Sequence, residues 1–323
     1  MDNLEINGIK TQLVDRKQRL LQAVAHPDSG FKFVSLLKEV DAALERIDNG
    51  TYGVCIVCND PIEEDRLIVN PLITVCLDHL DEHQRRSLET DLDLANKIQR
   101  SMLPKMKSAG EGWDVYYHYE PAGAVSGDYC DIIECDNNSY FVLGDVSGKG
   151  IAASMLMSHM HAFFHSTIPL GLGIVKLIER ASNLLCESTL ASHYATIVCV
   201  KADKDGKIEI CNAGHPPSLL VSKSGIKEIG STGMPIGLFC DSEYSSTLIK
   251  LDKGDALLLF SDGLSEAFFN DVEYGMDRVK KVAAENSGLS PKELVEKLLN
   301  DVNNYIAGKP KKDDLTIMAI KKD

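Results

Sequence analysis

The stretch "GDVSGKGIAASMLM" (residues 144–157) joins an apolar run to a helical pattern, and its glycines resemble those of a phosphate loop. A nucleotide-binding loop requires the spacing G-x-x-x-x-G-K-[ST] before a helix. Only three residues separate Gly144 from Gly148 here, and Lys149 is followed by glycine. The spacing therefore disfavours a nucleotide loop and directs attention to Asp145, which a tight glycine turn can bring onto a metal ion.

Three further turns carry aspartates, each at the end of an apolar run or beside a glycine: "GDYCD" (127–131), "SDG" (261–263) and "DDLT" (313–316). A single aspartate in a turn usually only caps or bends the chain. Four that converge would repel one another unless a hard divalent cation lies among them, and oxygen-only ligation favours Mg²⁺ or Mn²⁺. Two such ions bridged by a carboxylate can present hydroxide to a phosphorus centre, which is the chemistry of phosphoester hydrolysis.

The bulk properties limit the remaining classes of function. The chain has 323 residues of which 44% are apolar, and its net charge of −14 comes from 34 Lys and Arg against 48 Asp and Glu. This charge argues against a large surface for nucleic-acid backbones. Because no apolar run is long enough to span a bilayer and the start is not that of a signal peptide, we expect a cytoplasmic protein without a membrane partner.

The chain divides by pattern into four segments. Apolar residues at helical spacing predict a helical hairpin over 1–48, interrupted by "HPDSG". The turn-rich segment 49–82 is too short to bury a core of its own, and 83–107 is predicted to be a linker helix that ends near a proline. Within 108–323, hairpin-rich strands are interrupted by helical patterns at about 150–168, 172–190 and 290–305, which predicts an α+β fold, a sandwich covered by helices.

The segment 49–82 contains a candidate zinc site. Cys55 and Cys58 form one pair, and Cys76 and His79 form a second pair after seventeen intervening residues. Soft thiolates with an imidazole suit tetrahedral Zn²⁺, which would act as a structural staple. His83 lies one helical turn beyond His79, so either histidine can be the fourth ligand.

The stretch "GTYGVCIVCNDPIEEDRL", preceded by "ALERIDN", resembles the zinc finger and flanking helix of the DksA/TraR family. The resemblance covers about residues 30–85 and implies a structural zinc. In some members of that family a helical hairpin enters the secondary channel of RNA polymerase, which makes the polymerase a candidate partner. The hairpin tip "AHPDSGF" (25–31) lacks the acidic pattern that accompanies this activity, and His79 replaces a cysteine of many members.

The motifs "GDYCD", "GDVSGKGIAASMLM", "NAGHPP", "PIGL", "SDGLSEA" and "DDLTIMAI", in this order, resemble the bacterial PPM-type serine/threonine phosphatases of the SpoIIE/RsbU-like branch. The match covers about residues 90–323, including the helix "LANKIQRSMLP". The resemblance implies that Asp145 bridges two Mn²⁺ or Mg²⁺ ions beside the Val146 carbonyl. It further implies that Asp128 holds the second ion and that Asp262 and Asp313 complete the first, with Asp128 and Asp145 as the catalytic pair.

Several other residues are weighed and given lesser roles. Asp314 and Asp131 are secondary candidates that support the ligands from the outer coordination sphere, or else they are turn residues. His215 in "NAGHPP" is interpreted as structural, and the i, i+4 pair His161 and His165 does not make a metal site by itself. Lys149 is predicted to be a solvated side chain near the mouth of the site.

These observations lead to two hypotheses. The first is a metal-dependent phosphoprotein phosphatase that uses a metal-bound hydroxide on phosphoserine or phosphothreonine, with a phosphorylated STAS-type anti-sigma-factor antagonist as the substrate that the resemblance implies. The alternative is a zinc-finger regulator that binds RNA polymerase or another protein and carries a degenerate phosphatase scaffold. In either case the linker helix is predicted to couple the zinc module to the phosphatase or to form a homodimer.

Overall fold

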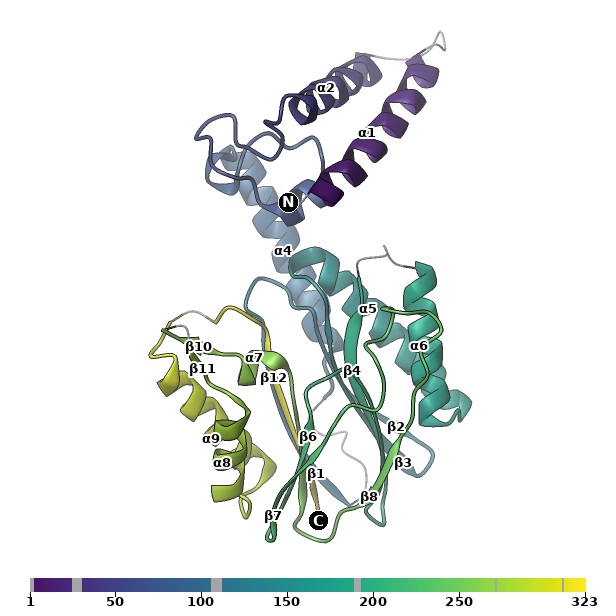
Figure 1. Ribbon diagram of the computed structural model, residues 1–323, viewed down its shortest axis with the longest axis vertical. Coiled ribbons are helices and arrows are strands. Elements are labelled where there is room, and N and C mark those ends of the chain that lie inside the picture. Colours follow the sequence, from purple (N-terminus) through teal and green to yellow (C-terminus); the bar gives the residue numbers. More distant parts are fainter. Residues whose placement is uncertain (1–2, 25–30, 106–111, 189–192, 271, 310) are drawn as a thin grey trace. The chain divides into compact units, whose positions relative to one another are not determined.

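The computed structural model describes residues 3–24, 31–105, 112–188, 193–270, 272–309 and 311–323 (Figure 1). It divides into two compact units, residues 1–91 and 92–323, and the division falls inside one long helix. Within the described ranges, no helix is both long and apolar enough to cross a bilayer. The hairpin tip predicted around 25–30 lies outside the described residues.

The first unit is built on a pair of antiparallel helices. Lys10 pairs with Asp48 and Lys17 with Asp41, each at 2.6 Å, so residue numbers rise along one helix as they fall along the other. The helical elements of this unit are α1 (Asn3–Val24), α2 (Phe31–Asp48), α3 (Glu64–Val69), η1 (Leu77–His79) and the start of α4 (Glu82–Met102).

The hairpin and the segment that follows it share one apolar core. Leu13 and Val40 from the two helices are fully buried in a cluster with Tyr52, Ile62 and Leu67. A segment too short to bury its own core is thus completed by the helices that precede it.

The second unit is a sandwich of two five-stranded sheets in which every strand pair is antiparallel. In spatial order one sheet comprises β2 (Asp128–Cys135), β3 (Asn138–Val146), β4 (Ala195–Asp203), β5 (Lys207–Ala213) and β8 (Thr247–Lys250). The other comprises β1 (Trp113–Glu120), β12 (Leu315–Lys322), β9 (Ala256–Phe260), β6 (Ser218–Ser222) and β7 (Gly225–Ile229). A separate small ribbon pairs β10 (Phe268–Phe269) with β11 (Val272–Glu273).

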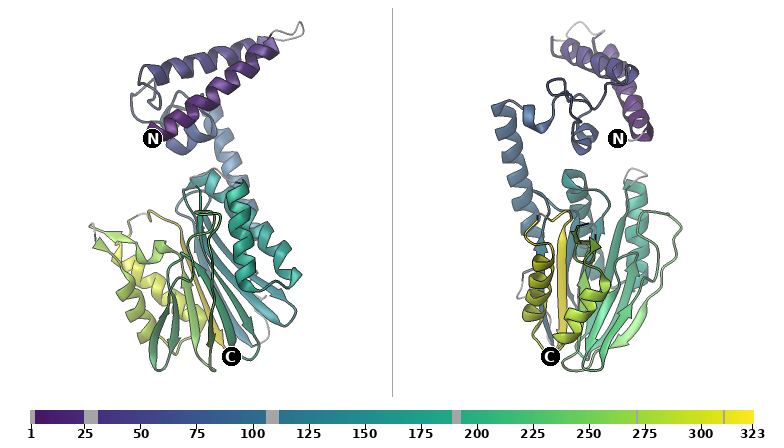
Figure 2. Two further views of the ribbon diagram at one scale, coloured as in Figure 1. Left: turned by 45° about the vertical axis from the view of Figure 1, so that its right-hand side comes forward. Right: turned by 60° about the vertical axis from the view of Figure 1, so that its left-hand side comes forward.

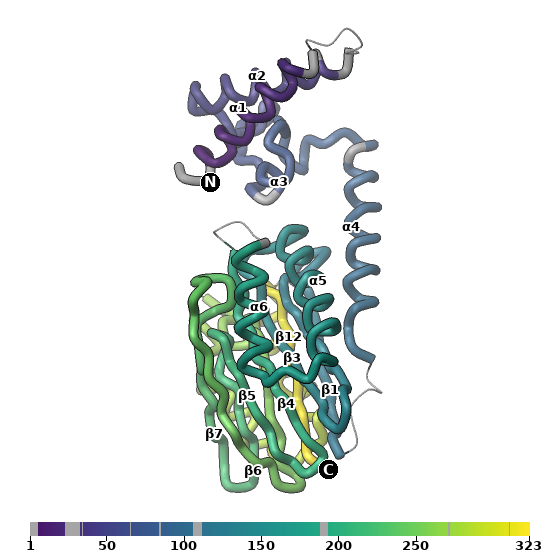
Figure 3. Tube along the Cα trace, turned by 90° about the vertical axis from the view of Figure 1, so that its right-hand side faces the viewer, coloured from purple at the N-terminus to yellow at the C-terminus, as the bar shows by residue number. Residues whose placement is uncertain are grey.

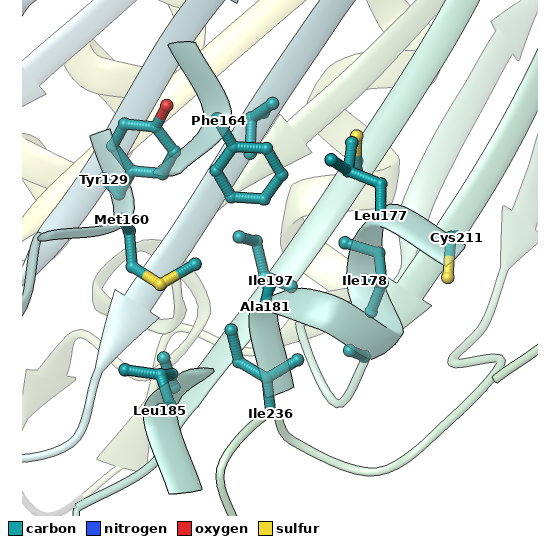
Figure 4. Packing of buried hydrophobic residues seen from close by; sticks show 14 of the residues in the cluster. Tyr129, Met160, Phe164, Leu177, Ile178, Ala181, Leu185, Ile197, Cys211 and Ile236 are labelled. Atoms are coloured by element: carbon teal, nitrogen blue, oxygen red, sulfur yellow. The ribbon is translucent and has the colours of Figure 1, made fainter. Parts of the chain in front are cut away.

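Helices cover the outer face of each sheet, as Figure 2 shows, and Figure 3 gives the side covered by α5 and α6. The first sheet carries α5 (Gly150–Thr167), η2 (Ile168–Leu170) and α6 (Ile174–Ser188), and the second carries α8 (Met276–Glu285) and α9 (Pro291–Tyr305), with the short α7 (Asp262–Ser265) at its end. Figure 4 shows Met160 and Phe164 of α5 and Leu177 of α6 packed with Ile197 of β4. The predicted α+β sandwich flanked by helices is confirmed.

Strand β9 shows why the sheets form from this sequence. All five of its residues are buried, because Leu257 and Leu259 face the core between the sheets while Leu258 and Phe260 face the helices α8 and α9. A strand covered on both faces has a continuous apolar run instead of an alternating pattern.

The cysteines of the second unit hold one covalent link that the sequence did not indicate. A disulfide joins Cys186 near the end of α6 to Cys240, which follows the segment "PIGL". It fixes that segment to the helix, together with a hydrogen bond of 3.1 Å from the Gly237 amide to the Ser182 hydroxyl.

Candidate active site

The four predicted aspartates lie at one end of the sandwich, two on each sheet. Asp128 begins β2 and faces Asp145 near the end of β3 in the antiparallel ladder. Asp262 follows β9 and Asp313 precedes β12, which are neighbouring antiparallel strands. The Thr316 hydroxyl of β12 donates a hydrogen bond to Asp128 Oδ2 and so ties the two sheets together beside the carboxylates.

The electrostatics of this end of the sandwich favour a cation. Burial, followed by the charges of Asp262 and Asp313, raises the pKa of Asp145 to about 7. Burial and then the charge of Asp145 raise the pKa of Asp128 well above its ordinary value. The buried Asp128 Oδ1 has no hydrogen-bond partner among the described residues, and an orphaned buried oxygen is costly. Oxygen donors under mutual repulsion fit hard divalent ions.

The carboxylates are not drawn into a tight cluster. In the described part of the chain two groups of three or more ligand atoms lie within 4.8 Å of one another, and neither includes these four aspartates. Asp313 instead forms an ion pair with Lys149, with 2.9 Å between Asp313 Oδ2 and Lys149 Nζ. Lys149, 62% exposed in its side chain, thus partly neutralises the site and is more than the solvated residue that the sequence predicted.

The turns that carry Asp262 and Asp313 are fixed to each other by backbone contacts. The Ser261 amide donates to the Thr316 carbonyl, and the Thr316 amide donates to Ser261 Oγ, each at 2.9 Å. A Cβ atom on Gly263 would lie 2.0 Å from the carbonyl oxygen of Asp314, so no other residue fits there without displacing the backbone. This close approach sets the separation of the two aspartate turns.

Asp314 holds the loop that leads into Asp128. Its Oδ1 accepts a hydrogen bond from the Ala122 amide at 2.7 Å and its Oδ2 one from the Gly127 amide at 2.8 Å. Because both carboxylate oxygens are used in this way, Asp314 acts on the site by positioning backbone.

Helix α4 fixes the same loop from another direction. Gln99, 3% exposed, donates from Nε2 to the Ser126 carbonyl at 2.7 Å and accepts from the Ser126 amide at 3.0 Å. Ser126 Oγ in turn accepts from the Asp128 amide at 3.0 Å. The C-terminal part of α4 is therefore two hydrogen bonds away from a proposed metal ligand.

The glycine-rich loop after Asp145 turns the chain into α5. Gly148 has φ of +93°, a conformation that favours glycine. Ser147 anchors the loop, since its amide donates to the Tyr194 carbonyl at 2.8 Å and its hydroxyl accepts from the Tyr194 amide at 2.9 Å.

In the first unit the four predicted zinc ligands are brought together. Their ligand atoms lie within 4.8 Å of one another, with Cys76 Sγ 3.2 Å from His79 Nδ1 and 3.7 Å from Cys58 Sγ. Burial opposes the ionisation of Cys55, but backbone hydrogen bonds from Cys58 and Cys76 prevail and lower the pKa of its thiol to about 6. Between the two histidines that the sequence left open, the group contains His79 and not His83.

The family model described as "Stage II sporulation protein E (SpoIIE)" matches residues 136–323. The chain belongs to the SpoIIE family. The model for the prokaryotic DksA/TraR C4-type zinc finger matches residues 50–78, so both resemblances read from the motifs are confirmed.

Individual proteins agree with this assignment. Phosphoserine phosphatase RsbP of Bacillus subtilis is 30% identical over 183 residues, which are 54% of this chain and 45% of RsbP. The SiaA-PP2C domain of Pseudomonas aeruginosa has a TM-score of 0.66 at 20% identity and covers 74% of this chain and 98% of that domain, which confirms the PPM-type fold. RNA polymerase-binding transcription factor DksA of Caulobacter vibrioides is 35% identical over 51 residues, 16% of this chain and 36% of DksA. The chain thus spans less than half the length of RsbP.

The secondary candidate Asp131 and the histidine His215 of this SpoIIE-family chain both lie outside the group of aspartate turns. Asp131 contacts His161 and His165 of α5 instead of an aspartate turn. His215 is 3% exposed, burial lowers its pKa to about 3, and its Nδ1 lies 2.9 Å from the Thr196 hydroxyl. Burial and the neutral form that it favours support the structural role that the sequence predicts for His215.

Proposed function

We propose that the chain is a metal-dependent phosphoprotein phosphatase that acts on phosphoserine or phosphothreonine. The observation that supports this proposal best is the pairing of buried Asp128 and Asp145 across one ladder with Asp262 and Asp313 beside them, at an end where no described side chain satisfies Asp128 Oδ1. The family membership and the phosphoserine phosphatase RsbP among its relatives support the same class of reaction.

Two Mn²⁺ or Mg²⁺ ions held there would polarise phosphoryl oxygens and lower the pKa of water. In this proposal Asp145 would serve both ions with the Val146 carbonyl beside it, Asp128 would hold one ion, and Asp262 and Asp313 would complete the other. The protein's own part is rigidity, because Thr316, Asp314 and Gln99 hold the carboxylates and the loop before Asp128 in place.

The experiment measures phosphate release from p-nitrophenyl phosphate and from a phosphoserine-containing STAS protein, with Mn²⁺ and with chelator. We expect Asp145→Asn to lower kcat by about 10³-fold or more, since it removes the bridging charge. The matched control is Asp136→Asn, an exposed aspartate in the turn between β2 and β3, at the other end of the same hairpin. Equal activity of both variants and wild type, or no dependence on metal, would refute the proposal.

The substrate that we propose is a phosphorylated STAS-type anti-sigma-factor antagonist. The proposal depends on the family and on the phosphoserine phosphatase relatives. A comparison of kcat/KM between such a phosphoprotein and a phosphoserine peptide cut from it would test the assignment, because protein recognition predicts a large preference for the folded substrate.

The first unit supports a separate proposal for its own role, a structural Zn²⁺ bound by Cys55, Cys58, Cys76 and His79. The likeness to DksA also makes RNA polymerase a candidate partner. Co-purification of core polymerase with the full chain, compared with a Cys76→Ser variant, tests it. Absence of polymerase from the wild-type sample would leave the finger as a regulatory module of the phosphatase alone.

We also propose a homodimer through α4. Leu94 and Ile98 lie one turn apart on this helix and are 56% and 49% exposed. An apolar pair at this spacing gives a stripe that a second helix can cover. Analytical ultracentrifugation of the wild type and of Leu94→Glu tests this proposal. A wild-type dimer that dissociates in the variant supports it, and a monomer in both samples contradicts it.

A further inference from the structure

A second group of metal-ligating side chains lies on the other face of β2, away from Asp128. Asp131 Oδ2, His161 Nδ1 and His165 Nε2 all lie within 4.8 Å of one another. Successive residues of a strand face opposite sides, and Tyr129 and Ile133 pack under the helices whereas Cys130 and Ile132 pack between the sheets. Asp131 therefore faces α5, on the side opposite to the proposed catalytic carboxylates.

The distances in this group are close to those of a tetrahedral metal site. Asp131 Oδ2 lies 3.1 Å from His161 Nδ1 and 2.8 Å from His165 Nε2. Bonds of about 2.0–2.1 Å to Zn²⁺ place tetrahedral ligand atoms about 3.3 Å apart. The two histidines are four residues apart and share one face of the helix. To hold an ion, the distances between these ligand atoms must increase by only about half an ångström. Small rotations of the two histidine side chains on α5 can provide this increase.

The carboxylate is held in a fixed orientation from behind. The Asp131 side chain is 2% exposed, its Oδ1 accepts from the Ile132 amide at 2.8 Å, and its Oδ2 accepts from the Tyr129 hydroxyl at 2.8 Å. Tyr129 itself is stacked on Phe164 with ring centroids 5.6 Å apart, and both rings are labelled in Figure 4. Such supporting contacts fix the ligand's geometry in metal sites.

The histidines supply an entrance from solvent. Exposure rises from the buried carboxylate to 23% for the His161 side chain and 47% for the His165 side chain. A site with three protein ligands and one open side leaves the fourth position for water or another small ligand.

We propose that Asp131, His161 and His165 form a binding site for Zn²⁺ or a similar transition-metal ion, distinct from both the finger and the aspartate site. Two imidazoles and a carboxylate suit zinc, whereas the oxygen-only aspartates suit Mn²⁺ or Mg²⁺. The ion joins β2, which begins at Asp128, to α5, which follows the loop after Asp145, so its binding stabilises the strand that carries Asp128 and the helix next to the Asp145 loop. This goes beyond the proposed phosphatase activity and does not depend on it.

The test is zinc stoichiometry of the full chain by elemental analysis after equilibrium dialysis against buffered Zn²⁺ in excess Mg²⁺. We expect about two equivalents for the wild type, one of them in the finger, and about one for His165→Gln, whose affinity for the second ion falls about 100-fold. His159→Gln is the matched control, since it changes a histidine of the same helix outside the group. It is expected to keep both equivalents.

Two further variants separate this site from the others. Asp131→Asn should lose the same equivalent as His165→Gln, and Asp145→Asn should keep it. Co²⁺ added to the full chain, after zinc has filled the finger, should give the visible bands of a tetrahedral site without thiolate charge transfer, and these bands should be absent from His165→Gln. Circular dichroism and melting at one equivalent of zinc, which fills the finger, verify that each variant is folded. A single equivalent in the wild type, or a second one that Asp145→Asn removes and His165→Gln retains, would overturn the proposal.

Discussion

The zinc-finger group of the first unit and the aspartate site of the second are two proposed metal sites that differ in how their ligands are held. In the finger the ligand atoms of Cys55, Cys58, Cys76 and His79 lie within 4.8 Å of one another, although little secondary structure surrounds them. In the second unit the aspartates stay apart, while a framework of strands and hydrogen bonds fixes their backbone. Thiols and imidazoles can pack while neutral, whereas carboxylates repel. For the two proposed sites we therefore expect metal to supply structure in the first unit and only chemistry in the second.

The largest effect is therefore expected from loss of the finger's metal. Cys76→Ser, or a strong zinc chelator, removes a binding free energy of about 10 kcal/mol or more that serves as folding energy for such modules. We expect residues 50–80 to lose protection in hydrogen exchange, while the sandwich strands β2 to β5 keep theirs. Chelation of Mn²⁺ and Mg²⁺ alone should leave both units folded. Loss of protection in the strands after either treatment would erase the distinction.

A smaller but still large effect is expected where the framework itself is changed. Gly263→Ala places a Cβ atom against the Asp314 carbonyl, 2.0 Å away in the present backbone. Relief of this overlap should cost about 3 kcal/mol of unfolding free energy and move Asp262 away from Asp313. Chemical denaturation and the Mn²⁺ dependence of activity measure the two consequences. Gly288→Ala is the control, because its added Cβ would meet nothing within 4 Å; equal effects of both substitutions would contradict the close-packing argument.

The next largest effect is expected from loss of the hydrogen bonds by which Gln99 holds the loop before Asp128. Gln99→Leu keeps the side-chain size but leaves the buried Ser126 amide and carbonyl without partners, which costs about 2 kcal/mol. The Mn²⁺ affinity should fall, since Ser126 orients Asp128. The control is Asn96→Leu on the same helix, because the Asn96 amide group bonds to the Ala124 carbonyl and to Arg100 Nε, and neither hydrogen bond involves Ser126. Activity and metal affinity unchanged in Gln99→Leu would show that α4 does not position the site.

Local sequence patterns predict most of the elements that carry the two sites, but they do not predict the contacts between segments that are far apart in the chain. Periodicity locates α5, α6 and α9 to within a few residues, and Ser290 and Glu293 form a capping box before α9 that short-range pattern can reveal. Helix α8 (Met276–Glu285) is missed, because only Val279 and Ala283 of its face are buried. Pairings such as Thr316 with Asp128, 188 residues apart, arise only when the two sheets meet.

The same limit applies to the side chains that surround each site. The i, i+4 spacing of His161 and His165 is visible in the sequence, but the carboxylate of Asp131 that completes the group comes from a strand thirty residues earlier. The choice of His79 over His83 depends on the turn at η1 (Leu77–His79), which places the His79 ring beside Cys76. Local pattern therefore predicts which residue types bind metal, while the fold decides which of them meet.

The smallest effect is expected from removal of the Lys149 charge, which occupies part of the position of the proposed metal ion beside Asp313. Lys149 Nζ lies 2.9 Å from Asp313 Oδ2 and also donates to the Lys312 carbonyl, so it competes with a metal ion for Asp313. Because the pair is exposed, Lys149→Met should leave the melting temperature nearly unchanged. Removing the competing charge should tighten Mn²⁺ binding about two- to fivefold. Calorimetric titration of Mn²⁺ measures this, with Lys309→Met as the control, since Lys309 contacts Asn270 and the Phe269 ring instead of an aspartate turn. Weaker binding in Lys149→Met would mean that the lysine holds Asp313 in a productive position, and the aspartate site would then resemble the finger in having its ligands arranged in advance of the ion.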